Sequence, residues 1–491
     1  FKACQIFKAD VIDGKSGKVA SNIEWPSDDA ETAVLKVLVD NNVPGITLDS
    51  TASDVADYLS KITDTTDTTS LPQSSILNKI ALAVEKSVTA TGDSFAAGRA
   101  FTTTSAGYYL FMTDTDSLSA NEKQTGTSPI FAVVGGNAVV VTEKTSIPTV
   151  TKQVKDDGAD NDWKYKADSQ MGQTVQYKLT GTVASNVDTF NTYYYEFHDE
   201  LSAGLTVDKS TVKAVIGETQ ITPTSVTMSD PDSNGRTVLS VKFDDLKAAA
   251  TAAGVTVGEH TRVVVTYSAK LDPNKSQHVV VGGTGNSNTV KLIYSNNPGH
   301  DSRGESVPDT VRDYTYALKL VKKDATDENK ILKGVKFTIR ATDPDDIASK
   351  DMYVQENGSL GTEASEFTTT DSGEINVKGL DAGTYTVKET HTLAGYNTIP
   401  EFTFTIKAIG FNQAEGEGEN KITVKTSTRG SNLVEVDTTN TDNGTAALIV
   451  KNKQGSGLPL TGLNGVTFTW IAGGAVLCIR SRKQAEESEQ E

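Results

Sequence analysis

The sequence predicts a mainly β protein made of tandem β-sandwich domains of the immunoglobulin-like type. Some helix is expected in the first domain, and an apolar helix at the C-terminal end. Short runs rich in Tyr, Thr and Val alternate in polarity with a period of two, which favours strands. Turns of Gly, Asp and Asn separate these runs, as in a sandwich. The 491 residues exceed what one hydrophobic core accommodates, so several domains are expected.

The first block, residues 1–145, mixes helix with strand. Residues Phe1, Ala3, Gln5 and Phe7 alternate onto one face of a strand, without the charged start and long apolar run of a secretory leader. We therefore expect a domain that lacks its leader and its first strand. Further along, periodicity predicts helices over Ala30–Val39, Thr51–Ile62 and Leu77–Ser87, and strands over Tyr108–Met112 and Ile130–Val134.

Two further blocks, residues 146–312 and 313–455, show the sandwich pattern of short strands and turns. The stretch 297–311, at the end of the block 146–312, is polar and rich in turn residues, so we expect it to link the two sandwiches. A last segment, residues 456–491, differs in composition from both.

Each sandwich block carries a lysine, an acid and an asparagine in phase with apolar strand residues, because side chains alternate along a strand. In the block 313–455, Lys322 follows Leu318 and Leu320, Glu389 follows Tyr385 and Val387, and Asn452 follows Leu448 and Val450. In the block 146–312, the residues in phase with their strands are Lys152, Asp199 and Asn288. Taken singly, each polar residue could lie at a strand end and reach solvent. Their recurrence in the same order favours two buried clusters.

The C-terminal segment combines a short motif with an apolar run. The motif Leu458-Pro459-Leu460-Thr461-Gly462 precedes an apolar run over 463–479. That run lies at the lower limit of about 17–25 residues for a membrane span. Arg480, Arg482 and Lys483 follow, as expected at the cytoplasmic end of such a span. The order resembles the cell-wall sorting signal of sortase substrates, although the tail after it is rich in glutamate. The resemblance implies that a sortase cysteine attacks the carbonyl of Thr461 and releases the chain from Gly462 onward.

The two sandwich blocks resemble the isopeptide-forming domains of Gram-positive major pilins and collagen adhesins. Gly383–Thr390 with Gly395-Tyr396 is similar to the acid-bearing strand of a Cna-B-type domain. Phe197–Leu201 and Gly285–Asn288 resemble the isopeptide-forming second domain of fimbrial subunits, and the first block resembles a pilin N-terminal domain. Asn286 is the alternative to Asn288, which is chosen because it is in phase with its strand.

This resemblance implies intramolecular bonds Lys152–Asn288 and Lys322–Asn452, promoted by Asp199 and Glu389. Burial would lower the lysine pKa and give a neutral, nucleophilic amine. It would also raise the pKa of the acid, which would keep a proton to polarise the asparagine carbonyl. The amine would then attack the amide carbon, and ammonia would leave. This happens once per site, so no turnover enzyme is expected.

A pilus also needs an acceptor amine for Thr461 of the next subunit. Backbone pilins carry it in a Tyr-Pro-Lys-Asn motif between the first and second domains. Lys144 occupies that place here, without the flanking Tyr, Pro and Asn. The alternative interpretation of Lys144 is a solvated linker lysine.

Charge and cysteine content limit the binding partners and the crosslinks that can be expected. The net charge of −18 disfavours nucleic acid and anionic lipid, which need a basic surface. The two cysteines, Cys4 and Cys478, offer no disulfide framework. The acidic run containing Asp156, Asp157, Asp160 and Asp162 fits a solvated turn better than a calcium loop, because the usual glutamate and spacing are missing. No cofactor or metal is expected.

We therefore expect a secreted, wall-anchored pilus backbone subunit at the cell surface. Its expected partners are a housekeeping and a pilus-specific sortase, identical subunits, peptidoglycan, minor pilins and host ligands. The main alternative is a monomeric wall-anchored adhesin or minor pilin with a ligand site in the first block. A third candidate, a wall-anchored enzyme, lacks a catalytic constellation in this sequence.

Overall fold

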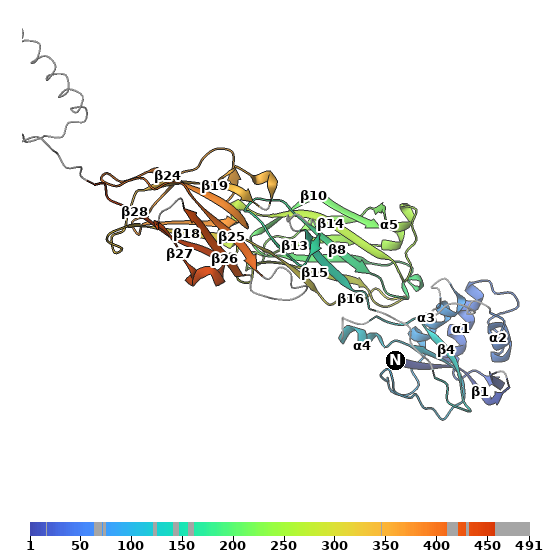
Figure 1. Cartoon of the computed structure of the whole chain (residues 1–491). Coiled ribbons are helices and arrows are strands. Elements are labelled where there is room, and N and C mark those ends of the chain that lie inside the picture. Colours follow the sequence, from blue (N-terminus) through green and yellow to red (C-terminus); the bar gives the residue numbers. More distant parts are fainter. Residues whose placement is uncertain are drawn as a thin grey trace, which may run out of the picture.

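The computed structural model describes residues 1–15, 17–62, 71, 75–120, 125–140, 147–155, 162–344, 346–409, 421–428 and 432–456. In these ranges the protein is mainly β, as the sequence predicts. Figure 1 shows three bodies in a row, with the N-terminus in the first of them and the third at the other end. Each body has its own hydrophobic core.

The first body is a four-stranded antiparallel sheet, in the order β2-β1-β3-β4, packed with helices. Its strands are β1 (Lys2–Gly14), β2 (Gly17–Glu24), β3 (Gly107–Met112) and β4 (Ile130–Val134). Its helices are α1 (Asp28–Asp40), α2 (Ala52–Leu59), α3 (Ile76–Ser87) and α4 (Thr115–Ala120). The three helices and two later strands predicted for this block are thus confirmed to within a few residues, while α4 was not predicted.

The helices of the first body begin where the sequence provides caps. The hydroxyl of Ser27 accepts a hydrogen bond from the backbone of Ala30 at the start of α1, and Thr51 forms a capping box with Asp54 at the start of α2. Such caps satisfy backbone N–H groups that have no partner within the helix. The apolar face of α1 then packs against the sheet through Val34 and Leu38.

The predicted face of the first strand is wrong beyond its first residues. The register of β1 against β3 shifts between Gln5 and Phe7. A bulge of this kind moves the following side chains to the opposite face. Phe7 therefore packs in the same core as Cys4 and Ile6, instead of sharing a face with Ala3.

The second body is a sandwich of two sheets. One sheet has the order β11-β10-β14-β8-β5-β6, with strands β5 (Val150–Lys155), β6 (Trp163–Lys164), β8 (Val175–Thr182), β10 (Leu205–Ile216), β11 (Thr219–Ile221) and β14 (Arg262–Leu271). The other has the order β12-β13-β9-β15-β17-β7, with strands β7 (Lys166–Asp168), β9 (Tyr195–Leu201), β12 (Ser225–Met228), β13 (Thr237–Phe243), β15 (Asn286–Ser295), β16 (Arg303–Glu305, paired with β15) and β17 (Asp309–Tyr314). Short helices α5 (Leu246–Ala252), η1 (Val187–Thr189) and η2 (Pro273–His278) connect strands.

The third body is also a two-sheet sandwich. One sheet has the order β23-β18-β28-β27, with strands β18 (Tyr316–Asp324), β23 (Glu374–Leu380), β27 (Val434–Asp437) and β28 (Thr445–Asn452). The other has the order β21-β20-β19-β24-β25-β26, with strands β19 (Lys336–Pro344), β20 (Tyr353–Val354), β21 (Leu360–Gly361), β22 (Phe367–Thr368, paired with β19), β24 (Gly383–His391), β25 (Phe402–Ile409) and β26 (Lys421–Thr428). Two 3-10 turns, η3 (Ile347–Ser349) and η4 (Thr438–Asn443), lie between strands.

The stretch 297–311 is not the linker that its composition predicts. It contains β16 and the first residues of β17, and both strands pair with β15 inside the second body. Strand β17 also pairs in parallel with β7 through Asp313. The second core ends at Val311 and the third begins at Tyr314, so a single strand joins the two sandwiches.

Polar side-chain contacts connect the bodies. Between the second and third, the side-chain oxygen of Gln170 accepts hydrogen bonds from the Tyr385 hydroxyl (3.0 Å) and the Asp381 backbone (3.1 Å). Between the first and second, Glu85 pairs with His300 at 2.9 Å. These contacts, like strand β17, hold neighbouring bodies in series.

Candidate functional site

A buried cluster in the third body joins Lys322 of β18, Glu389 of β24 and Asn452 of β28. Strands β18 and β28 are parallel neighbours in one sheet, and β24 lies in the facing sheet. All three residues are buried, Lys322 completely. The structure therefore brings together the three residues that strand phase selects in this block.

The contacts within this cluster are direct. The amine of Lys322 lies 3.0 Å from a carboxylate oxygen of Glu389 and also donates to Oδ1 of Asn452. The amide nitrogen of Asn452 donates to the other oxygen of Glu389 at 2.9 Å. In this orientation the carboxyl group faces the amide nitrogen, whereas the sequence-based hypothesis has it polarise the carbonyl oxygen.

Thr392 is a member of the cluster that the sequence analysis missed. Its hydroxyl accepts a hydrogen bond from the amide nitrogen of Asn452 at 2.8 Å. Thr392 follows the end of β24, so strand phase gives no signal for it. Together with Glu389 it fixes the orientation of the amide.

A second buried cluster spans the two sheets of the second body. Lys152 comes from β5, whereas Asp199 and Asn288 come from the neighbouring strands β9 and β15 of the opposite sheet. These three side chains are completely buried. Asn286, the alternative asparagine, lies outside this cluster, because its amide nitrogen donates to the backbone oxygens of Val280 (2.9 Å) and Asp313 (3.1 Å).

Tyr267 of β14 lies at the centre of the second cluster, and the sequence analysis missed it as well. Lys152 donates to the two carboxylate oxygens of Asp199 at 2.5 and 2.6 Å, and to the Tyr267 hydroxyl at 3.1 Å. The hydroxyl in turn donates to Asp199 at 2.6 Å. The amide nitrogen of Asn288 donates to the same hydroxyl at 2.7 Å. Among the described residues, Oδ1 of Asn288 has no hydrogen-bond partner.

Burial has the largest effect on the pKa of both lysines. It lowers the pKa of Lys152 to about 8, against the opposing effect of Asp199. It lowers the pKa of Lys322 to about 8 as well, against the opposing effect of Glu389. Desolvation disfavours the charged form of an amine. Each lysine therefore gives up a proton to its neighbouring acid more readily than a lysine in water.

The aromatic rings beside the lysines differ between the clusters. Lys322 lies over Phe337, with its amine 5.2 Å from the ring centre. Lys152 lies beside Tyr177 and Tyr267, whose rings stack with centres 5.3 Å apart. Burial raises the pKa of the Tyr267 hydroxyl well above its usual value, with a further contribution from Asp199. The second cluster thus contains a protonated hydroxyl that has no counterpart at Phe337.

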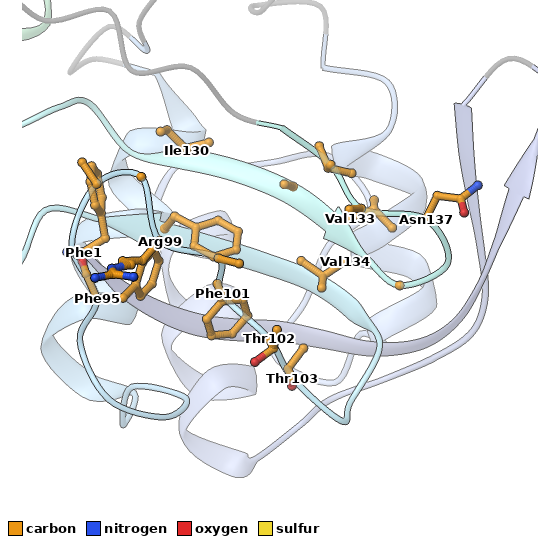
Figure 2. A pocket seen from close by; sticks show the side chains of 18 of the residues that line it. Phe1, Phe95, Arg99, Phe101, Thr102, Thr103, Ile130, Val133, Val134 and Asn137 are labelled. Atoms are coloured by element: carbon orange, nitrogen blue, oxygen red, sulfur yellow. Dashed lines mark hydrogen bonds between the residues drawn. The ribbon is translucent and has the colours of Figure 1, made fainter.

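The first body carries a groove with a volume of about 520 Å³. Figure 2 shows Phe95, Arg99 and Phe101 from one loop on one side of it, and Ile130 and Val134 of β4 on the other. The ring centres of Phe95 and Phe101 lie 5.7 Å apart, so these two side chains form an aromatic wall of the groove. It is separate from both buried clusters.

Several predicted features lie outside the described residues. They are Lys144, the motif Leu458-Pro459-Leu460-Thr461-Gly462, the apolar run 463–479, and Asp156, Asp157 and Asp160 of the acidic run. In the part of the chain that the structure describes, no helix is long and apolar enough to cross a membrane. Over the same part, no group of three or more His, Cys, Asp or Glu side chains is arranged to hold a metal ion.

Comparison with known proteins identifies the class of fold. Residues 317–421 match the SpaA prealbumin-like fold domain. No curated protein has a significantly similar sequence. Among solved structures, the T6 backbone pilin of serotype M6 Streptococcus pyogenes, a modular three-domain protein, matches with a TM-score of 0.51 and 14% identity, covering 93% of this chain and 96% of that one.

Two further major pilins match less closely. Full-length SpaD from Corynebacterium diphtheriae has a TM-score of 0.42 and 20% identity, with 71% of this chain and 80% of that one covered. The C-terminal fragment of GBS80 from Streptococcus agalactiae has a TM-score of 0.40 and 20% identity, with 53% of this chain and 91% of the fragment covered. The match to the T6 pilin carries the conclusion: the chain has the fold of a backbone pilin.

Proposed function

We propose that this protein is the structural backbone subunit of a covalently polymerised pilus, anchored to the cell wall of a Gram-positive bacterium. Sortase joins the subunits head to tail, through Thr461 of one and Lys144 of the next. The proposed domains are residues 1–145, 146–312 and 313–455, followed by the sorting signal at 456–491. The observation that carries the proposal is the serial arrangement of two buried Lys–acid–Asn clusters in a fold like that of a backbone pilin.

Each cluster forms one intramolecular amide bond. The acid takes a proton from the lysine, the neutral amine attacks the amide carbon of the asparagine, and ammonia leaves. The enclosure excludes water and holds the reacting groups near each other. The bonds are Lys152–Asn288 and Lys322–Asn452, and in a protein without a disulfide framework they supply the covalent reinforcement.

The ends of the chain set the direction of polymerisation. A donor near the C-terminus and an acceptor near the end of the first domain make a heterologous contact between identical subunits. Such a contact does not close by symmetry, so it builds an open fibre. A high-mass ladder in wall extracts on denaturing gels is the expected result. A single monomer band from cells that express the protein and its sortases would rule the polymer out.

The second candidate is a wall-anchored adhesin or minor pilin. The aromatic groove beside Phe101 favours it, because concave apolar sites commonly hold ligands. This candidate needs the sorting signal and both crosslinks but no reactive Lys144. The same gel separates the two, since an adhesin on the wall gives no ladder.

A further inference from the structure

The Tyr267 hydroxyl contacts all three groups that react in the second body. It accepts from the amine of Lys152 (3.1 Å), donates to Asp199 (2.6 Å) and accepts from the amide nitrogen of Asn288 (2.7 Å). We propose that Tyr267 is the proton relay of this crosslink, carrying a proton from Asp199 to the departing nitrogen of Asn288. The inference rests on the proposed Lys152–Asn288 bond and goes beyond it, since a bond can form without a relay.

The need for a relay follows from the contacts of the acid. Both carboxylate oxygens of Asp199 contact Lys152, and one also accepts from Tyr267. No hydrogen bond between the side chains of Asp199 and Asn288 occurs among the described residues. Asp199 can receive the amine's proton in this arrangement, but only the tyrosine hydroxyl connects it to the leaving nitrogen.

The third body supplies the comparison. There the longer acid, Glu389, contacts the leaving nitrogen of Asn452 directly at 2.9 Å. The aromatic ring beside its lysine is Phe337, which has no hydroxyl. One site therefore has a glutamate that reaches the amide, and the other has a shorter aspartate plus a tyrosine hydroxyl that spans the remaining distance.

With this relay, every proton and bond in the reaction is accounted for by Lys152, Asp199, Tyr267 and Asn288, and no other reagent is needed. Asp199 first takes a proton from the ammonium group of Lys152, and the neutral amine forms the Nζ–Cγ bond with Asn288 as the carbonyl π electrons move onto Oδ1. The Tyr267 hydroxyl turns, passes its proton to Nδ2 and is reprotonated by Asp199. The Cγ–Nδ2 bond then breaks, the carbonyl re-forms and ammonia departs. The extra proton on the new amide nitrogen passes to Asp199, which ends protonated.

The acidity of Tyr267 suits this role. Burial and the neighbouring Asp199 hold the pKa of its hydroxyl well above the usual value, so it stays protonated at neutral pH. To relay a proton, the hydroxyl gives its own proton to Asn288 and takes another from Asp199, and its hydrogen bonds to both residues provide the path. Proton transfer by a positioned side chain contributes about 10²–10⁴-fold to a rate.

The test is Tyr267→Phe in the full chain. The chain is recovered unfolded in urea and refolded by dilution, and crosslinked peptides are followed by mass spectrometry over time. We expect the Lys152–Asn288 bond to form at least about 100-fold more slowly than in the wild type. The Lys322–Asn452 bond should form at its wild-type rate. The matched control is Tyr195→Phe, which removes a hydroxyl of the same core that bonds to the backbone of Thr182. It should leave both rates unchanged.

A second variant separates the loss of the relay from a packing defect caused by Tyr267→Phe. In the double variant Tyr267→Phe with Asp199→Glu, the longer acid should reach the amide as Glu389 does, and the bond should return. A wild-type rate in the single variant overturns the relay, as does a folded double variant that stays uncrosslinked. If the wild type itself loses no ammonia at either site, the proposed bonds fail, and that outcome is distinct from failure of the relay.

Discussion

Lys322 and Asn452 are in contact although 130 residues separate them, and they lie on the strands by which the chain enters and leaves the third sandwich. Because β18 and β28 are parallel, the two side chains meet near the same end of the sheet. A bond there would carry tension along β18, across to Asn452 and out of the body. The residues that lie between Lys322 and Asn452 in the sequence would then bear none of this tension.

The second sandwich repeats this arrangement. Lys152 lies on its first strand, β5, and Asn288 lies on β15, which pairs with the exit strand β17. A bond between them would pass tension from the entry strand to β15 and on toward the third body. The two proposed crosslinks thus lie in series along the row of bodies in Figure 1.

The first prediction concerns mass. The intact recombinant protein should be lighter than its sequence by two ammonia masses, one for each bond. Glu389→Ala should restore one of them, because the Lys322–Asn452 reaction loses its acid while the second-body cluster is untouched. Intact-protein mass spectrometry decides, and a mass equal to that of the sequence contradicts both bonds.

The second prediction concerns stability. Asn452→Ala removes a crosslink that closes a loop of roughly 130 residues, which by analogy with a disulfide contributes about 4–5 kcal/mol through the entropy of the unfolded chain. We expect the free energy of unfolding of the third body to fall by at least that amount in denaturant titrations. Asn376→Ala, at an exposed position in the same sheet, is the control and should change little. A loss below about 1 kcal/mol at Asn452 would contradict a covalent role, since ordinary hydrogen bonds contribute that much.

The clusters show what strand phase can and cannot predict. Period two finds Lys152, Asp199 and Asn288 because each continues the buried face of a strand, but it does not separate Asn288 from Asn286 on the same face of β15. It does not find Tyr267, because a tyrosine on the buried face of β14 is indistinguishable in the sequence from an ordinary core aromatic residue. Its role arises only when β14 faces β9 and β15 across the sandwich, and that packing has no local signature.

The mistaken linker has a similar origin. The polar composition of 297–311 is that of a connecting segment, yet Ser306 is buried and Val311 belongs to the second core. Strand β17 is held by pairing with β15 and by a parallel pairing with β7, far away in the sequence. Non-local pairing of this kind overrides local composition.

The third prediction concerns pH. The reactive form of each cluster has one proton on the acid and none on the amine, so it holds as many protons as the ion pair. The pKa of Lys152 and of Lys322 is about 8, and above that pH the pair loses this proton. Refolding experiments should therefore give similar rates of bond formation at pH 7 and 7.5, and roughly tenfold slower formation at pH 9. A rate that climbs steadily above pH 8 would mean that a neutral amine suffices and the acid's proton is not needed.

The fourth prediction concerns anchoring. Replacing Thr461 by Ala should release the protein to the medium or leave it in the membrane fraction, because sortase would no longer form its thioester at this residue. Cell fractionation with muramidase extraction measures the wall-bound share. Thr467→Ala, in the segment discarded after cleavage, is the matched control and should leave anchoring intact. Wall attachment that survives Thr461→Ala would remove the sorting signal from the proposal.

The fifth prediction identifies the acceptor of polymerisation. In the sequence, Lys144 follows β4, the last strand of the first body, and precedes β5, the first strand of the second. We expect a lysine that connects two domains in the sequence to be accessible to a sortase thioester. Lys152 is close in sequence, but its complete burial beside Asp199 excludes it as an acceptor in the folded subunit.

The experiment is Lys144→Ala in a strain that makes the fibre, with Lys155→Ala as the control on the following strand. Loss of the high-mass ladder with monomer still on the wall supports Lys144, because anchoring through Thr461 needs no acceptor on this chain. The control should keep a full ladder. A full ladder in Lys144→Ala moves the acceptor to another exposed lysine while leaving the polymer in place. The missing Tyr, Pro and Asn around Lys144 make this the most discriminating measurement, since a sortase that accepts this site must recognise it without that motif.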